Sequence, residues 1–405
     1  MVFFLVYWLL ASIYGNDIIQ HKIFGIDSFI IFLLLGIMEF FVVFFVKRKE
    51  PWNIKIKQYK IFKIVGLYVL CSLFYVIISF FNYQKLFDIG VSYSVSYIFR
   101  QAYPIAFFPI GILVGFGCLQ IYETNNKAKL INIGAIVLWG FLIIVNHFYK
   151  ADIIPYRMFI MLIAVFILAR NKKKLYSIPL IFTILFEIDF FHSSSSMIGV
   201  LVPIVFVISV YKWHKFYSKH IISVALVAVV CLFLSFYCFE DYLNEFFHFD
   251  LNYLWRYQYW VSEIKLVIRS MFIGLGFGTA YADNSLLDII VNNKMFVGES
   301  GLFLVTQHSS LVNAFYRMGI VGLVIFIILI MYPIKYVCKH YNSISNKNAA
   351  CLYLFLYLNC LIIICLNPGL ESPRFAMGYI FSYSLLMSFC IKEIKSKRFR
   401  EEKTE

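Results

Sequence analysis

The sequence predicts an all-α, polytopic integral membrane protein with about 12 transmembrane helices and one long outer loop between the ninth and tenth helices. Hydrophobic residues make up 62% of the 405 residues, well above the roughly half that is usual in globular domains. Runs of about 20 apolar residues recur, which is the length that crosses a hydrocarbon core as a helix. Because backbone polar groups in lipid must bond internally, these runs are expected to be helices, and the alternating pattern of a transmembrane barrel is absent.

The apolar runs give the expected position of each span. They lie near residues 2–14, 28–46, 61–81, 101–122, 130–148, 153–169, 175–191, 195–211, 220–239, 309–333, 350–366 and 374–391. The first run lacks a basic start and an Ala-x-Ala cleavage site, so we expect a retained span and not a signal peptide. No internal repeat or soluble domain is visible, and residues 1–405 are predicted to form a single transmembrane domain.

Basic segments predict the orientation of the chain. They follow the even-numbered spans, at Lys47–Lys60, Lys127–Lys129, Arg170–Lys174, Lys212–Lys219, Lys335–Lys347 and Lys392–Lys403. Basic residues gather in the cytoplasmic loops of membrane proteins, which accounts for the net charge of +14 without a nucleic acid partner. Both termini are therefore expected in the cytoplasm, and residues 240–308 are expected to form an extracytoplasmic loop that carries part of the active site.

Arginine and lysine are distributed differently in this topology. Of 26 lysines only five lie on the predicted outer side, whereas six of ten arginines do: Arg100, Arg157, Arg256, Arg269, Arg317 and Arg374. An arginine guanidinium is a planar, permanently charged fork that binds phosphate bidentately, whereas lysine is a point charge. A diphosphate substrate at the outer face would explain the difference. The alternative is that each outer arginine pairs with a nearby acid, such as Glu263, Glu371 or Asp152.

Two of these arginines lie in distinctive surroundings. Arg317 follows His308 by nine residues, roughly 13 Å deeper along a helix. A charge at that depth is costly unless it faces a wet cavity or a partner. Arg256 and Trp260 lie in the aromatic segment 253–260, which predicts a helix at the membrane interface. Aromatic faces also suit stacking against sugar rings, and anchoring at the interface is the alternative.

The segment that contains Gly274, Gly276 and Gly278 resembles a phosphate loop only superficially. No strand precedes it and no Gly-Lys-Thr follows it, so nucleotide binding by this segment is not expected. A tight turn that returns the backbone to the membrane face is expected instead. The nine cysteines form no CxxC pair, which argues against a disulfide framework or a zinc site.

One motif carries a family resemblance. His308-Ser309, nine further residues and then Gly319-x-x-Gly322 match the pattern H[NSQ]-x9-G-x-x-G. With Arg256 and the glycine segment before it, the chain resembles the O-antigen polymerase and ligase superfamily (the Wzy and WaaL proteins). Taken alone, a histidine at a helix start is often only a cap, and small residues at 319 and 322 allow close helix packing.

The resemblance implies a GT-C-like glycosyltransferase of the bacterial inner membrane that takes a glycan from undecaprenyl diphosphate. It implies no metal and no nucleotide cofactor. His308 and Arg256 match the family's functional residues: the histidine as base or as the group that orients the acceptor, the arginine stabilising the departing diphosphate. The other residues expected to bind substrate are Arg269, Arg317, Arg374, Arg157 and Trp260. The expected partners are the lipid-linked oligosaccharide and membrane lipid, and a chain-length regulator is left open.

The segment His192–Met197 bears on the choice between polymerase and ligase. Ligase-like members often carry an arginine after a serine or threonine here, whereas this chain has four serines and no arginine. The departure favours polymerisation of repeat units into O-antigen or capsular polysaccharide over ligation to lipid A-core. A flippase, which would bind diphosphate with the same arginines but need no base, is the alternative from another class. Internal repeats would favour a flippase.

Overall fold

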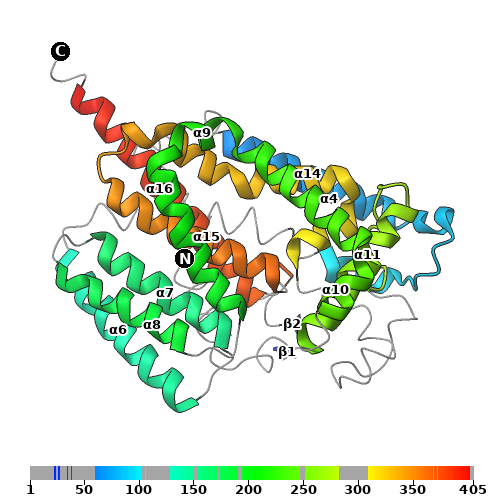
Figure 1. Cartoon of the computed structure of the whole chain (residues 1–405), viewed down its shortest axis with the longest axis horizontal. Helices are drawn as coiled ribbons and strands as arrows, with labels where there is room; N and C mark the ends of the chain where they lie inside the picture. The colour runs from blue at the N-terminus through cyan, green and yellow to red at the C-terminus, as the bar shows by residue number, and fades with distance from the viewer. Residues whose placement is uncertain are drawn as a thin grey trace.

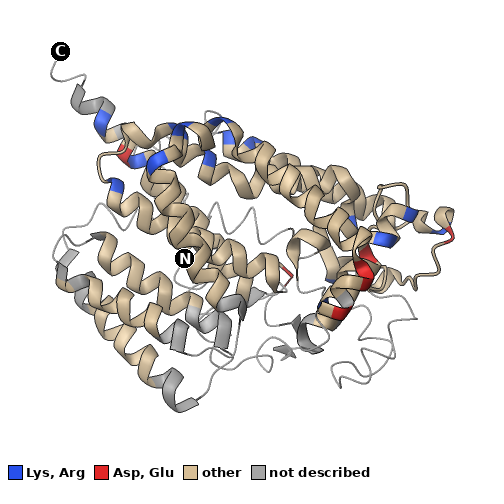
Figure 2. Ribbon diagram, viewed as in Figure 1, with Lys and Arg blue, Asp and Glu red and all other residues tan. Residues whose placement is uncertain are grey.

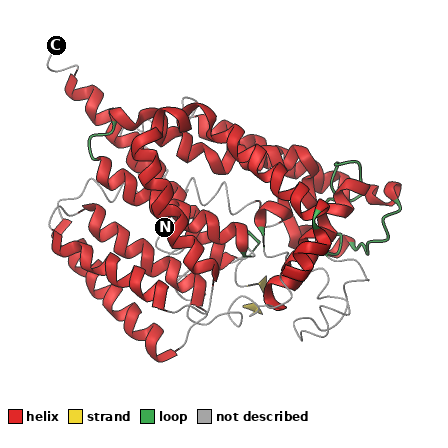
Figure 3. Ribbon diagram, in the orientation of Figure 1, coloured by secondary structure: helices red, strands yellow, loops and turns green. Residues whose placement is uncertain are grey.

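The computed structural model describes most of the chain from residue 60 onward. The described residues are 22–23, 26–27, 34, 38, 60–102, 105, 128–149, 153–170, 174–189, 194–246, 251–281, 309–367, 369–371 and 373–401. Within them, helices dominate, and the strands are the two-residue hairpin partners β1 (Lys22–Ile23) and β2 (Ile26–Asp27) (Figure 3). The predicted all-α class is confirmed, and this small hairpin is an addition that the sequence does not predict.

Five helices of the described chain are long and apolar enough to cross a membrane. They are α4 (Lys60–Ser79), α9 (Ser194–Cys238), α14 (Ser310–His340), α15 (Lys347–Leu366) and α16 (Pro373–Glu401). Two helices offer shorter apolar stretches, α6 (Ala128–Tyr149) and α7 (Ile153–Arg170), and the shorter helix α8 (Ile178–Asp189) follows them. A polytopic membrane protein is therefore confirmed. The number of spans stays a prediction, because the expected spans 2–14, most of 28–46 and most of 101–122 lie outside the described residues.

The structure of α9 shows that one predicted loop is wrong. The segment Lys212–Lys219 is predicted as a loop, but it is helical, and the backbone departs from helical geometry at Trp213, with φ −117° and ψ 25°. This segment contains neither glycine nor proline, so its residues favour continuing the helix. Figure 1 shows the two arms of α9 meeting at this bend. A straight helix of 45 residues would be roughly 68 Å long, about twice a hydrocarbon core, so the bend lets each arm cross separately.

Helices α14, α15 and α16 form the interior of the molecule. Helix α14 packs against α9 and α4, and α15 packs against α9, α16 and α7, while α6, α7 and α8 lie together at one end (Figure 1). In the apolar part of α16, 83% of the residues are buried, against 11% in α9. The exposed face of α9 is therefore the apolar surface that lipid would cover.

Three basic segments that are predicted to be cytoplasmic lie at the same end of the molecule. Figure 2 shows lysine and arginine gathered over the α9 bend and the neighbouring ends of α14 and α16. His214 at the bend stacks on Tyr341 with ring centroids 4.8 Å apart, and Lys397 of α16 donates to the Asn342 carbonyl at 3.1 Å. The fold thus groups these segments on one side, and that this side is the cytoplasm stays a prediction.

The predicted outer loop contains helices. Those within the described residues are α10 (Glu240–Phe246) and α11 (Leu251–Arg269), which an ion pair between Lys265 and Glu240 joins. The expected helix over 253–260 is confirmed as part of α11, and an irregular segment, residues 270–281, follows it. We call this segment the glycine loop. That residues 240–308 form an extracytoplasmic unit stays a prediction.

Candidate functional site

Tyrosine side chains from α4 and the turn that follows it hold the first part of the glycine loop. The hydroxyl of Tyr75 donates to the Ile273 carbonyl at 2.7 Å, and the hydroxyl of Tyr83 donates to the Gly274 carbonyl at 2.9 Å. These carbonyls belong to no helix or strand, so they need side-chain partners when they are buried. These bonds fix the glycine loop against α4, a helix that lies far from the loop in the sequence.

A buried glutamine holds the second part of the glycine loop. The Gln101 amide donates to the Thr279 carbonyl at 2.9 Å and accepts from the Gly278 N–H at 2.7 Å. The Ser94 N–H adds a bond to the Gly278 carbonyl at 2.8 Å. Several backbone groups of the glycine loop are therefore paired with distant segments, which is the kind of support that a precise site needs.

Helix α14 breaks at Gly319, and the glycine loop fills the break. The backbone at Gly319 has φ 58° and ψ −156°. Loop N–H groups, those of Leu275 and Gly276, donate to carbonyls of the turn before the break at 2.8 and 3.0 Å. Past the break, the Ile320 N–H donates to the Phe272 carbonyl at 3.0 Å. Backbone groups that a continuous helix would pair internally are thus paired with the loop.

The break requires glycine on both sides. A Cβ at Gly319 would lie within 3.0 Å of the Phe272 carbonyl oxygen, and a Cβ at Gly274 would lie within 3.0 Å of the Gly319 nitrogen. Close packing between helices, the alternative interpretation of the motif glycines, therefore does not describe Gly319. Its hydrogen atom is needed because a loop, and not a neighbouring helix, comes against the backbone there.

Arg317 lies inside this arrangement, with only 1% of its surface exposed. Its Nη1 donates to the Gly276 carbonyl at 2.8 Å and to the Thr279 hydroxyl at 2.5 Å. Its guanidinium carbon lies 4.0 Å from the centroid of the Tyr281 ring. Its Nε and Nη2 are also buried, and within the described part of the chain they have no hydrogen-bond partner. Arg317 thus keeps N–H groups available in fixed positions.

A small pocket, with room for about one water molecule, lies beside Arg317. Helix α14 lines it with Ser310, Asn313 and Arg317, and the turn between α15 and α16 lines it with Glu371. Gln101, whose amide also holds the glycine loop, lines the pocket as well. A guanidinium, amides, a hydroxyl and a carboxylate therefore face one cavity, and these groups suit a ligand with phosphate and hydroxyl groups.

Glu371 is held firmly at the edge of this pocket. Ser310 Oγ donates to its Oε2 at 2.8 Å, and the Asn313 amide donates to its Oε1. Burial raises the pKa of the Glu371 carboxyl, and the Arg317 charge and these hydrogen bonds partly offset that rise. The sequence suggests Glu371 only as an ion-pair partner for an arginine, because no motif marks it as a site residue.

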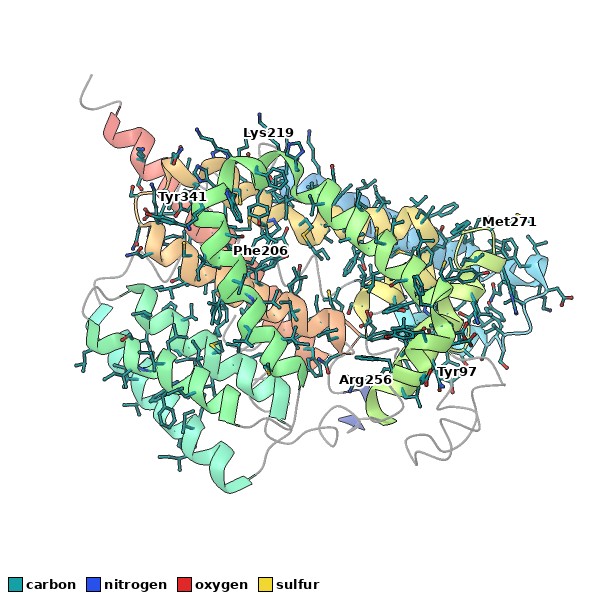
Figure 4. All side chains as sticks on the ribbon, in the orientation of Figure 1. Tyr97, Phe206, Lys219, Arg256, Met271 and Tyr341 are labelled. Atoms are coloured by element: carbon teal, nitrogen blue, oxygen red, sulfur yellow. The ribbon has the colours of Figure 1, made fainter. Side chains whose placement is uncertain are left out.

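Helix α11 points Arg256 and Trp260 toward different neighbours. Arg256 donates to the Leu366 carbonyl at 3.3 Å, at the end of α15 (Figure 4). A cation is favourable there because the carbonyls at a helix C-terminus carry partial negative charge. Trp260 stacks on Phe236 of α9 with ring centroids 6.0 Å apart. Arg256 therefore lies beside the segment that leads to Glu371, whereas Trp260 packs against α9.

The remaining predicted site residues are placed only in part. Arg269 is exposed in the last turn of α11. Arg157 and Arg374 belong to α7 and α16, but their side chains lie outside the described residues, as does all of His308. Ser309, which follows His308, is the N-cap of α14 and accepts from the Val312 N–H at 3.4 Å. The roles assigned to these four residues stay predictions.

Comparison with known families supports the resemblance that the motif indicates. A family model described as O-antigen ligase matches residues 179–327, a region that contains α9, α11, the glycine loop and Arg317. Among curated proteins no sequence matches this chain. The family match covers the H[NSQ]-x9-G-x-x-G motif and the break in α14 that the motif encodes. Residues 179–327 are therefore similar to the O-antigen ligase family, which supports the resemblance to the O-antigen polymerase and ligase superfamily.

Proposed function

We propose that this protein polymerises oligosaccharide repeat units that are linked to undecaprenyl diphosphate, at the outer face of the bacterial inner membrane. One observation carries the proposal: Arg317 is fully buried, yet its Nε and Nη2 have no hydrogen-bond partner among the described residues and its side chain lines a pocket. A charged group in that state is costly unless a ligand completes its hydrogen bonds. A diphosphate is the anion that the family's chemistry supplies.

The proposed reaction needs stabilisation of a leaving diphosphate. As the bond between the anomeric carbon and the diphosphate oxygen breaks, negative charge develops on the departing group. A guanidinium that is already fixed can stabilise this charge without reorganising, and donors of this kind contribute about 10²–10³ in rate. The hydrogen bonds of Arg317 to Gly276 and Thr279 hold the guanidinium in one position before the reaction.

The two predicted catalytic residues keep their roles in this proposal. Arg256 would assist the diphosphate from the end of α15, where it already bonds the Leu366 carbonyl. His308 would act on the acceptor hydroxyl, as base or as the orienting group. Its chain neighbours support this placement, because Ser309 begins α14 and Ser310 lines the pocket.

Ligation to lipid A-core is the second candidate function, and the description of the matching family favours it. Against it stands the segment His192–Met197, which lacks the arginine that ligase-like members often carry. The acceptor distinguishes the two reactions. In polymerisation the acceptor is the terminal sugar of another lipid-linked repeat, and in ligation it is the lipid A-core.

The glycan profile of a strain that lacks this protein tests the proposal directly. Loss of a polymerase leaves a single repeat attached to the final anchor. Loss of a ligase leaves long chains on the carrier lipid, and loss of a flippase leaves single repeats on the carrier in the cytoplasm. We expect the first profile, restored by the wild-type gene and not by Arg317→Ala. Long carrier-linked chains would overturn the polymerase assignment in favour of the ligase.

A further inference from the structure

The pocket beside Arg317 contains a carboxylate with a placement suited to proton transfer. Glu371 lies in the turn between α15 and α16, and it lines the same cavity as Arg317. Resting on the proposed glycosyl transfer, we infer that the Glu371 carboxylate takes the proton from the attacking hydroxyl of the acceptor sugar. Nothing in the motif of the family points to this residue, and the inference follows from the pocket alone.

Two residues of α14 orient the carboxylate. Asn313 and Ser310 from the first turns of α14 donate to its two oxygens, and Ser310 Oγ in turn accepts from the Leu370 N–H at 2.8 Å. The side chain is thereby locked to the start of α14 and to its own turn. A general base must lie within hydrogen-bond reach of the proton it accepts, so this fixation matters as much as basicity. Ser310 and Asn313 are positioning residues in this scheme.

The charge environment fits a base that is ionised before the reaction. Arg317 of α14 interacts electrostatically with Glu371 as a cation. Titratable groups of the described residues that also interact with it include Tyr68 of α4, Cys365 of α15 and Tyr281 of the glycine loop, all uncharged near neutral pH. Arg317 therefore favours the ionised carboxylate, while burial makes that carboxylate a stronger base than an exposed glutamate.

In the proposed glycosyl transfer, the proton acceptor and the group that stabilises the leaving diphosphate line the same pocket. The acceptor oxygen forms a bond to the anomeric carbon of the donor, and the bond from that carbon to the diphosphate oxygen breaks. The hydroxyl proton moves to Glu371, and the diphosphate leaves with the electron pair and is stabilised by Arg317. The attacking oxygen loses a proton while the leaving oxygen gains negative charge. A carboxylate and a guanidinium meet these opposite needs, and His308 then has the orienting role.

Separate measurements of donor binding and turnover test the inference. The experiment measures how tightly purified lipid-linked repeat binds and how fast it is polymerised. The proteins compared are the full-length wild type and the variants Glu371→Gln, Glu371→Asp and Glu240→Gln. Glutamine keeps the shape of the side chain but cannot accept the proton, so we expect donor binding within about threefold of wild type and turnover lower by about 10²–10⁴. Glu371→Asp should regain part of the turnover, and Glu240→Gln, which removes a carboxylate that pairs with Lys265, should behave as wild type.

The outcomes separate the inference from the proposed function. Turnover by Glu371→Gln within tenfold of wild type would overturn the inference, and so would a loss of donor binding that equals the loss of turnover, since that marks a structural residue. If the glutamine variant does not accumulate, Glu371→Asp decides, because it retracts the carboxylate by one methylene: a loss of turnover with donor binding within about threefold of wild type supports the inference, and equal losses of both, or no loss, overturn it. Failure of the wild type itself to transfer the lipid-linked glycan would instead defeat the proposed function.

Discussion

Replacing Gly319 by alanine tests the central feature of the site, the break in α14 that the glycine loop fills. The backbone there, with φ 58° and ψ −156°, is essentially restricted to glycine. The added Cβ would also lie within 3.0 Å of the Phe272 and Ile273 carbonyl oxygens. The glycine loop must therefore move away, which breaks the hydrogen bonds that Leu275, Gly276 and Ile320 make across the break.

The expected cost follows from these losses. Backbone strain of this kind costs about 1–3 kcal/mol, and each of the three hydrogen bonds contributes about 0.5–1.5 kcal/mol. The free energy of unfolding should fall by about 2.5–7.5 kcal/mol, a large share of the roughly 5–15 kcal/mol typical of proteins. Activity should fall as well in any folded fraction, because the displaced loop carries the Gly276 and Thr279 groups that fix Arg317.

Gly66→Ala is the matched control, since it makes the same chemical change within helix α4. A Cβ at Gly66 meets nothing within 4 Å, and alanine favours a helix over glycine by about 1 kcal/mol. The assay is thermal unfolding of both variants in one detergent, together with polymer formation at matched protein level. We expect Gly66→Ala to keep wild-type activity with equal or slightly higher stability, and Gly319→Ala to lose both stability and activity. Equal behaviour of the two variants would refute the structural role assigned to the break.

Four further predictions follow from the site and the topology. Arg317→Lys should lose about 10²–10³ in turnover, nearly as much as Arg317→Ala, because lysine lacks the planar fork; near-normal polymerisation in vitro would contradict the diphosphate role. Arg256→Lys should likewise resemble Arg256→Ala, whereas an ion pair worth about 0–1 kcal/mol at a wet surface predicts that lysine restores function. His308→Ala should abolish polymer in cells while protein level and single-repeat product persist, and normal polymer length would remove this histidine from the mechanism. A cysteine at Asn292 should react with an impermeant thiol reagent in intact spheroplasts and one at Ser345 should not; the reverse labelling would invert the topology.

Apolar patterning predicts the helices of this chain well, because burial in lipid demands both apolar side chains and internal backbone bonds. The bounds of α4, α15 and the arms of α9 agree with the expected spans within a few residues. The prediction of a loop at residues 212–219 is wrong, because hydropathy alone does not distinguish a polar loop from a polar stretch of helix. A basic, polar segment reads as a loop, yet without glycine or proline it continues a helix and only bends at Trp213.

The site could be predicted only in part, because it depends on contacts between distant segments. The depth of Arg317 indicates that its charge needs a partner, and the structure supplies carbonyl and hydroxyl groups from a loop some 40 residues earlier. Nothing local in the sequence indicates that this loop reaches α14. Glu371 shows the same limit: its importance arises only when the turn after α15 meets the start of α14. Hydrophobic periodicity and amino-acid composition do not indicate which distant segments come into contact.

The spacing of the H[NSQ]-x9-G-x-x-G motif acquires a physical meaning from this geometry. Ser309 begins α14 and Gly319 breaks it, so the nine residues between them form about two and a half helical turns. On such a helix, residues at i, i+3 and i+7 share a face, and Ser310, Asn313 and Arg317 stand at those positions and line the pocket. The break must come directly after this face, because the glycine loop that enters it also fixes Arg317. One residue more or less would turn the helix by about 100° between cap and break, and the pocket residues could not meet both Glu371 and the loop. The spacing therefore couples the start of the helix, which orients the carboxylate, to the break, which orients the guanidinium.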